Sequence, residues 1–328
     1  MRKKQTKNMN RRLFCTAVAA LGAPWLAHAQ SYPERPIKIL QGFAAGGNAD
    51  TIARLIGTEI GKSLNQTVVV EAQTGAGGTI ASAAVSRAKP DGHTLLLATG
   101  GHAVAGALYN TLPYQTVNSF EMVSTVTFFP FLIVTAADSK YRTLRDLLAA
   151  AKANPDTIGY GSAGIGSTHH LAGEVLAKMA GVELLHVPYR GDAASITAVL
   201  AGDIPVVIAP ATAVLSNIKA GKLRALATSG GQRWPGLPEV LTAAEQGVTG
   251  YDVRSWAGLM APAGTPRPII DKLNAETLKV LMQPQIKARL EEIGGEARGS
   301  TPEEMKAMVT SELQRWTRVV NDAKIPKQ

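Results

Sequence analysis

Short β-branched runs alternate with helix-like segments along most of this chain, and this alternation is the strongest constraint on its fold. In the first part of the chain, apolar runs at 37–40, 67–72 and 94–99 are separated by helical patterns at 51–64 and 80–88. Alternation of strand and helix predicts a parallel sheet with helices on both faces. The near-continuous apolar character of these runs fits strands that are buried on both sides.

The pattern starts again after the long apolar run 120–136. Helical patterns then alternate with strand-like runs, at 143–153, 158–162, 169–180, 186–189, 194–201, 204–209 and 223–228. From Pro266 onward the chain is predicted to be helical without a strand of its own, with cap or first-turn signals at Thr265–Pro266 and Ser300–Glu303. Two α/β units in a chain of this length predict two lobes with a cleft between them.

Residues 1–29 have the character of a secretory signal peptide. Six basic residues and no acidic one precede an apolar run, and Ala27-His28-Ala29 fits a small-residue cleavage site. The apolar run has about 15 residues, whereas a spanning helix needs about 20. We therefore expect export with cleavage near Ala29/Gln30. The Arg11-Arg12 pair would suit twin-arginine export, and the general secretory route fits the same segment equally well.

Charge and cysteine content narrow the function classes. Removing the leader takes away six of the 34 basic residues and none of the 25 acidic ones, so the formal net charge falls from +9 to +3. Nucleic-acid binding then loses its main support, because that class needs a basic patch on the folded domain. The one cysteine, Cys15, lies in the leader. Disulfides and thiolate metal sites are therefore not expected in the remaining chain.

Three strand-to-helix junctions consist almost wholly of small residues: 42–50, 74–81 and 161–170. In open α/β sheets, ligands bind beyond the carboxyl ends of the strands, where such junctions lie. The start of a helix offers unpaired N–H groups and a partial positive charge, and a loop of Gly and Ala lets an anion approach them. One such junction could be only a tight turn, but three of them predict an anion-binding site in the cleft.

Familiar catalytic and cofactor motifs are missing from the sequence. No glycine-rich stretch has the spacing of a phosphate-binding or dinucleotide-binding loop, so no nucleotide cofactor is expected. Ser162, Ser167, His169 and His170 could suggest a serine hydrolase, but there is no GxSxG elbow. The adjacent histidines point to different helix faces, which disfavours a metal site. Glu174 and Asp192 are interpreted as solvated or capping charges. We expect no cofactor, no metal and no catalytic residues.

Nine segments carry a further signal: GFAAGGNADTIAR, VVVEAQTGAGGTIA, DGHTLLLAT, LYNTLPYQ, GSAGIGSTHHLAGEVL, AGVELLHVPYRG, IKAGKLRALATSGGQRWPGLPEV, TAAEQG and SWAGLMAPAGTP. In this order and spacing they resemble the substrate-binding proteins of tripartite tricarboxylate transporters, the Bug-type receptors. The resemblance covers essentially all of residues 31–328. It implies an α/β chain with a two-lobed, type II-like periplasmic-binding-protein fold, in which each lobe is a sheet flanked by helices and two hinge crossings join the lobes.

The resemblance also implies a function and a site. The chain would be a periplasmic, non-enzymatic receptor that closes on a small carboxylate and delivers it to membrane permease subunits. Each lobe would contribute a loop that holds a carboxylate through backbone N–H groups, small hydroxyls and waters. The residues expected at the ligand are Phe43, Ala44, Ala45, Gly46, Gly47, Asp50, Gly77, Gly78, Thr99, Ser162, Gly166, Ser167, Thr168, His169, Tyr189 and Ala209. Many members carry an aspartate at the position of Ala209, where it can serve an amino group. A di- or tricarboxylate or an aromatic carboxylate is therefore expected rather than an amino acid.

We expect lobe 1 to comprise residues 30–126 and 255–328, and lobe 2 to comprise 127–254. Hinge closure of a monomer would then trap the ligand between the lobes. Two alternatives stay open at this point. One is a sensor that acts through a histidine kinase of a two-component system. The other is a periplasmic hydrolase or isomerase that uses His169 and a serine.

Overall fold

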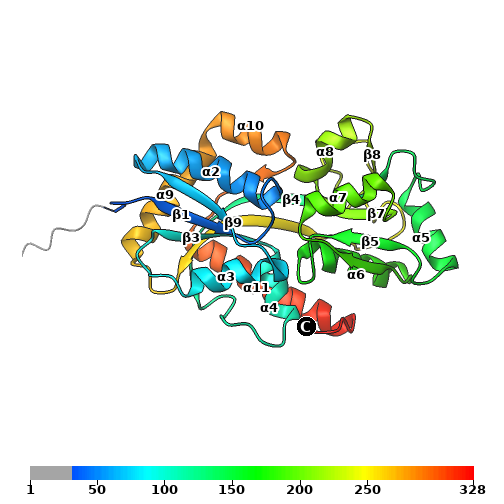
Figure 1. Cartoon of the computed structure of the whole chain (residues 1–328), viewed down its shortest axis with the longest axis horizontal. Coiled ribbons are helices and arrows are strands. Elements are labelled where there is room, and N and C mark those ends of the chain that lie inside the picture. The colour runs from blue at the N-terminus through cyan, green and yellow to red at the C-terminus, as the bar shows by residue number, and fades with distance from the viewer. Residues whose placement is uncertain (1–31) are drawn as a thin grey trace, which may run out of the picture.

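The computed structural model describes residues 32–328, so the predicted leader and its cleavage site lie outside the described residues. The described chain forms two lobes, and each lobe is a sheet flanked by helices. The first lobe contains both ends of the described chain, coloured blue, orange and red in Figure 1, and the second contains the middle, coloured green. Across these residues no helix is both long enough and apolar enough to cross a membrane.

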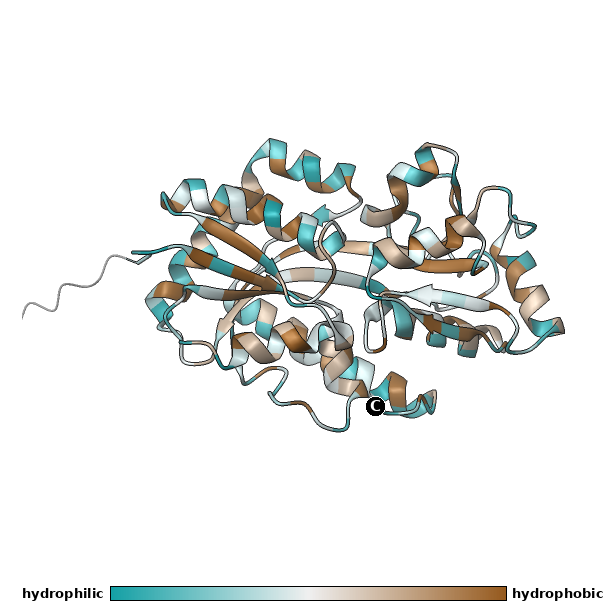
Figure 2. Cartoon of the chain, in the orientation of Figure 1, coloured by the Kyte–Doolittle hydropathy of each residue, from teal (hydrophilic) through white to brown (hydrophobic). Residues whose placement is uncertain are grey.

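The first lobe is built around strands β1, β2, β3 and β9, with helices on both faces (Figure 1). Its elements are β1 (Ile37–Gln41), α2 (Asn48–Leu64), β2 (Val68–Ala72), the 3-10 turn η2 (Ala76–Gly78), α3 (Thr79–Ser86), β3 (Thr94–Thr99), α4 (Gly101–Leu108), β9 (Arg254–Pro262), α9 (Arg267–Met282), α10 (Pro284–Glu292), β10 (Glu296–Ala297) and α11 (Pro302–Asp322). The strands and helices expected from the alternation are confirmed here. Helices show alternating apolar and polar bands in Figure 2, as expected where one face packs on a sheet.

The second lobe repeats the same plan with a parallel β7-β5-β6 sheet. Its elements are α5 (Leu144–Ala153), β5 (Gly159–Ser162), α6 (Thr168–Ala180), β6 (Leu185–Pro188), α7 (Asp192–Ala201), β7 (Val206–Pro210), α8 (Ala211–Lys219) and β8 (Leu223–Thr228). The expected helix at 143–153 begins with a capping box, in which Thr143 and Asp146 satisfy each other's backbone N–H groups. All the elements expected in this part of the chain are present.

The expected parallel pairing is confirmed for β1, β2 and β3 and for β5, β6 and β7, but the centre of the molecule is antiparallel. The long strand β4 (Phe120–Ala136) is antiparallel to β9, β7 and β8, and β9 is antiparallel to β3. Both long strands are entered from irregular segments rather than from a crossover helix, so nothing forces them into the parallel direction. The resulting strand order is β2-β1-β3-β9-β4-β7-β5-β6.

The C-terminal tail also differs from expectation in two details. It contains the two-residue strand β10, which pairs with Thr127 and Phe128 of β4, and a strand this short leaves no pattern in the sequence. Thr265 does not cap α9, because its hydroxyl donates to the carbonyl of Pro262. The start signal before α11 is confirmed, since Thr301 caps this helix in a capping box with Glu304.

Strand β4 changes partners in its middle, and this is where the lobes join. Residues up to Pro130 pair with β9, whereas residues from Phe131 onward pair with β7 and β8. Pro130 has no N–H to donate to a ladder, which suits a position where pairing changes. The second crossing lies at the start of β9, next to Arg254. The lobe boundaries given from the sequence stay a prediction, because strand pairing alone does not define rigid bodies.

Ser229 ties the two crossings together. It is fully buried, and its backbone N–H donates to the carbonyl of Phe131 (2.9 Å) while its carbonyl accepts from the N–H of Val253 (2.8 Å). The Ser229 hydroxyl accepts from the N–H of Phe131 (2.9 Å) and donates to the carbonyl of Val253 (2.5 Å). One hydroxyl therefore satisfies a buried donor and a buried acceptor from two different chain crossings.

We predict that Ser229→Ala lowers the free energy of unfolding by about 1–3 kcal/mol, because it leaves the buried N–H of Phe131 and carbonyl of Val253 without this partner. Urea unfolding followed by circular dichroism measures the change. Ser216→Ala is the matched control, since Ser216 is an exposed residue of α8. Equal stability of the two variants would contradict the role assigned to Ser229.

Candidate functional site

The two lobes touch each other through glycines. A Cβ on Gly77 of the first lobe would lie 2.8 Å from the carbonyl carbon of Gly166 and 2.8 Å from the carbonyl oxygen of Ile165 in the second lobe. Gly191 similarly faces Ala44. Side chains at these places would keep the lobes apart. The loops of small residues therefore permit close approach of the two backbones, and the structure describes a closed arrangement.

A small buried cavity lies between the lobes in this closed arrangement. Its volume is about 20 Å³, enough for about one water molecule. The first-lobe residues that line this cavity come from β3, β9, the start of α2 and the loop before it. The second-lobe residues come from the starts of α6 and α7, and one further residue comes from β4. The lining residues are Phe43, Asn48, Ala49, Thr99, Phe129, Thr168, His169, Asp192 and Ser255.

Three helices begin at this cavity. In each helix, the first N–H that donates to a backbone carbonyl lies four residues after the capping residue. In α2 the N–H of Thr51 donates to the carbonyl of Gly47. In α6 that of Leu171 donates to Ser167, and in α7 that of Ser195 donates to Gly191. The N–H groups that precede them belong to the first turns, which include the lining residues Asn48, Ala49, Thr168, His169 and Asp192. No side chain caps α2 or α7. First-turn N–H groups have no partner within their helix and carry partial positive charge, so their convergence favours an anion.

His169 and Asp192 face the same cavity with unused hydrogen-bonding atoms. Their exposed fractions are 8% and 7%. The Nε2 of His169 lies 3.0 Å from the Oδ1 of Asp192, but these two atoms are not aligned for a hydrogen bond. Both ring nitrogens of His169 and the Oδ1 of Asp192 have no partner among the described residues. Buried polar atoms are nearly always hydrogen-bonded in folded proteins, so these atoms indicate a place for a ligand or water.

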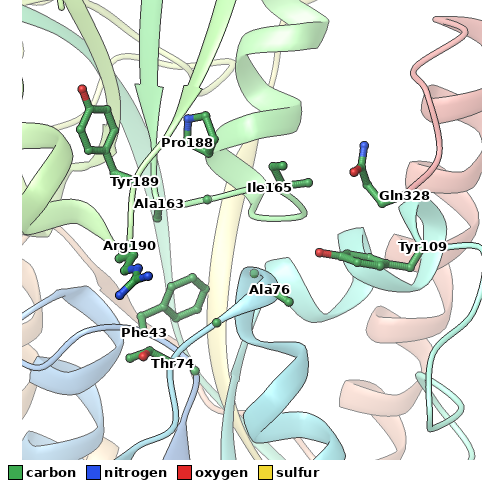
Figure 3. A pocket seen from close by; sticks show the side chains of 14 residues that line it. Phe43, Thr74, Ala76, Tyr109, Ala163, Ile165, Pro188, Tyr189, Arg190 and Gln328 are labelled. Atoms are coloured by element: carbon green, nitrogen blue, oxygen red, sulfur yellow. The ribbon is translucent and has the colours of Figure 1, made fainter.

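A larger cavity of about 620 Å³ lies on the other side of Phe43, which borders both cavities. Figure 3 shows residues of both lobes around it, with Phe43, Thr74 and Ala76 from one lobe and Tyr189 and Arg190 from the other. This volume is typical of sites for small molecules. Arg190 is exposed and is the basic side chain of the lining. Its aromatic members are Phe43, Tyr109 and Tyr189.

Several N–H groups of the first-lobe loop bond within the loop region, and that of Gly47 donates to the carbonyl of Ala44 (3.2 Å). The N–H of Phe43 donates to the Gln41 side chain (2.7 Å), and that of Gly46 donates to the Oδ2 of Asp50 (3.0 Å). Burial opposes the charge of Asp50, but hydrogen bonds from Arg54 and from the Gly46 N–H outweigh it and hold the pKa of Asp50 below its usual value. Asp50 therefore organises the loop. The donors that face the small cavity belong to the helix that follows.

The second-lobe loop rests on a buried polar cluster. Ser162, which is fully buried, lies 2.6 Å from the Nε2 of His186, and the ring of His186 stacks on that of His170 with centroids 4.0 Å apart. Burial lowers the pKa of His170 to about 4. Burial and the neighbouring His170 together lower the pKa of His186 to about 3. Burial also raises the pKa of Glu174, which accepts a hydrogen bond from Tyr160.

This cluster bears on the hydrolase alternative. Within this cluster Ser162 contacts His186, whereas His169 faces Asp192 in the small cavity. Ser162 also binds its own loop, where it accepts from the N–H of Gly164 (3.0 Å). A nucleophile needs an accessible oxygen next to its base. The geometry at Ser162 supports the loop and offers no accessible oxygen.

The residues expected at the ligand separate into three groups. A third cavity of about 10 Å³ lies beside Gly78. The expected residues that line one of the three cavities are Phe43, Gly77, Gly78, Thr99, Thr168, His169 and Tyr189. Those that lie where the lobes approach each other are Ala44, Gly47 and Gly166. Those that line none of these cavities are Ala45, Gly46, Asp50, Ser162, Ser167 and Ala209, the last of which is fully buried in the second lobe. Their part in binding stays a prediction.

Several lining residues were not expected from the sequence. The interpretation of Asp192 as a solvated or capping charge is wrong, because its carboxylate is buried at the cavity and no side chain caps α7. A signal for it existed, since Asp192 opens the helix after β6 and so marks a fourth strand-to-helix junction. Phe129 and Ser255 lie on β4 and β9, and no local pattern marks them as lining residues. The others are Asn48, Ala49, Tyr109 and Arg190.

Several known proteins are similar to this chain in sequence and in structure. The family model described as the tripartite tricarboxylate transporter family receptor matches residues 52–325. The periplasmic binding protein BugD is 35% identical, with a TM-score of 0.87 over 90% of this chain and 100% of that one. Rpa4515 of R. palustris, solved with adipate, is 32% identical, with a TM-score of 0.87 over 90% and 100% of the two chains. MatC from Rhodopseudomonas palustris, solved with bound malate, is 32% identical, with a TM-score of 0.84 over 88% and 100%.

These similarities extend across both lobes and agree with the observed two-lobed architecture. The fold expected from the sequence is confirmed. This chain belongs to the tripartite tricarboxylate transporter receptor family of solute-binding proteins.

Proposed function

We propose that this protein is an exported periplasmic receptor that captures a small di- or tricarboxylate or aromatic carboxylate between its lobes. It would act as a monomer and deliver the ligand to the membrane permease subunits of a tripartite transporter. The observation that carries the proposal is the convergence of the α2, α6 and α7 N-termini on one buried cavity. The adipate and malate bound to two relatives give the same chemical class.

Backbone donors can hold a carboxylate at this place without an arginine. Hydrogen bonds from N–H groups to a charged oxygen contribute about 1.5–3 kcal/mol each when water is excluded. The small cavity would receive one carboxylate, and the rest of the ligand would lie past Phe43 in the larger cavity, within reach of Arg190. Since the small cavity has room for about one water molecule, the ligand-bound form is expected to be slightly more open here.

Closure explains how binding would be reported to a partner. Helix α2 belongs to one lobe, and α6 and α7 belong to the other, so a carboxylate can contact all three only when the lobes are together. A ligand that binds the closed form better shifts the population toward it. Permease subunits could then distinguish loaded from empty receptor by the relative position of the lobes.

A thermal-shift screen of the protein without its leader tests the ligand class. Carboxylates present at about 100 times their Kd should stabilise the folded state by about 2.7 kcal/mol and raise Tm measurably. The panel would contain aliphatic dicarboxylates, tricarboxylates and aromatic carboxylates, with amines and sugars as other classes and sodium chloride at matched ionic strength as the control. Stabilisation by an amine or a sugar, and by no carboxylate, would overturn the proposal.

Gly77→Ala tests whether the glycine contact between the lobes is needed for binding. The new Cβ would collide with the backbone at Gly166, so we expect carboxylate affinity to fall at least tenfold by calorimetry. Gly181→Ala is the matched control, because both glycines have φ = +63° but Gly181 has open space around it. The two variants should lose similar stability, and Gly181→Ala should retain wild-type affinity. Wild-type affinity in Gly77→Ala would show that this contact is not required.

A further inference from the structure

Asp192 and His169 offer polar atoms to a part of the ligand other than its carboxylates. The side chains of Asp192 and His169 are 8% and 10% exposed, and both residues line the cavity where α2, α6 and α7 begin. The Oδ2 of Asp192 approaches the opposite lobe, since a Cβ on Gly47 would lie 3.7 Å from it. Among the described residues, His169 is the side chain that lies within ion-pair distance of Asp192.

A ligand that carries carboxylates alone offers no donor to Asp192. The Oδ1 of Asp192 is an acceptor, and a carboxylate placed next to it offers no proton and adds a like charge. The buried Oδ1 would then keep only its poorly aligned contact with His169, and a missing hydrogen bond costs more for a charged group than for a neutral one. The cavity therefore needs a hydrogen-bond donor beside the ligand carboxylate.

The same pair distinguishes a hydroxyl from an ammonium group. A neutral imidazole has one N–H donor and one acceptor nitrogen, so His169 supplies a donor in either tautomer. A hydroxyl group donates once and can also accept, and therefore can bind Asp192 and His169 together. An ammonium group only donates, so it can bind Asp192 but offers no acceptor to the His169 N–H.

We propose that Asp192 and His169 select a ligand with a hydroxyl group next to one of its carboxylates, so that the protein prefers hydroxy acids to their unsubstituted parents. The hydroxyl would donate to the Oδ1 of Asp192 and accept from His169, while the carboxylate lies at the helix N-termini. This inference rests on the proposed carboxylate-binding function and specifies the ligand class of that same site.

Calorimetry on matched ligand pairs tests the inference. The pairs are succinate and malate, glutarate and 2-hydroxyglutarate, tricarballylate and citrate, and phenylacetate and mandelate, each with both enantiomers where they exist. For at least one pair, the wild-type protein should bind the hydroxy acid about tenfold more tightly than its parent, or about 1.4 kcal/mol. Asp192→Ala should remove most of this preference, mainly by weakening the hydroxy acid. Asp192→Asn keeps the shape and should reduce the preference in the same direction.

Asp203→Asn is the matched control, because Asp203 is exposed just beyond the other end of α7. It should keep the wild-type preference, and circular dichroism of all variants would confirm that they fold. Parents that bind as tightly as their hydroxy acids, or a preference that survives in Asp192→Ala, would overturn this inference while leaving carboxylate binding intact. Aspartate or glutamate binding more tightly than malate or 2-hydroxyglutarate would also overturn it. Binding of no acid from any pair would overturn the proposed function as well.

Discussion

Strand β4 is the element on which the rest of the molecule depends. It pairs with β9 along one half and with β7 and β8 along the other, so a single strand serves the sheets of both lobes. The change of partner at Pro130 fixes where the lobes meet, and Ser229 ties Phe131 to Val253 at that point. The strand-to-helix junctions of both sheets face the cleft that this joint creates. Phe129, on the first-lobe side of the joint, lines the buried cavity.

The glycines at the cleft have a role that the sequence did not suggest. Gly77 and Gly166 allow the backbones of the two lobes to touch. In the loop 42–47, the N–H groups of Phe43 and Gly46 bond to Gln41 and Asp50, so these two groups are not available to a ligand. The donors that face the cavity come from the first turns of α2, α6 and α7. Closure and anion binding are thus coupled, because glycine contacts bring helices of different lobes to one point.

Much of the site could be predicted because it lies at strand-to-helix junctions, which leave a local pattern. Phe43, Thr168 and His169 were expected for this reason, and all three line the buried cavity. Ala209 was expected by family resemblance, but it packs inside the second lobe and lines none of the three cavities. Asp192 was read as a solvated charge because a single acidic residue at a helix start is usually a capping or surface group. Phe129 and Ser255 lie within long strands, where no periodicity marks one residue as facing a cleft.

The sequence by itself determined most of the elements, their order and the division into two α/β units, because hydrophobic periodicity, turn residues and caps act over a few neighbouring positions. It did not predict α4, α8, β9 or β10. It also determined the family, through motifs spread along nearly the whole chain. Only the tertiary structure decided the antiparallel course of β4 and β9, the contact between Gly77 and Gly166, and the meeting of His169 with Asp192. These depend on which distant segments lie side by side. That choice is made by packing of the whole chain, and local patterns do not encode it.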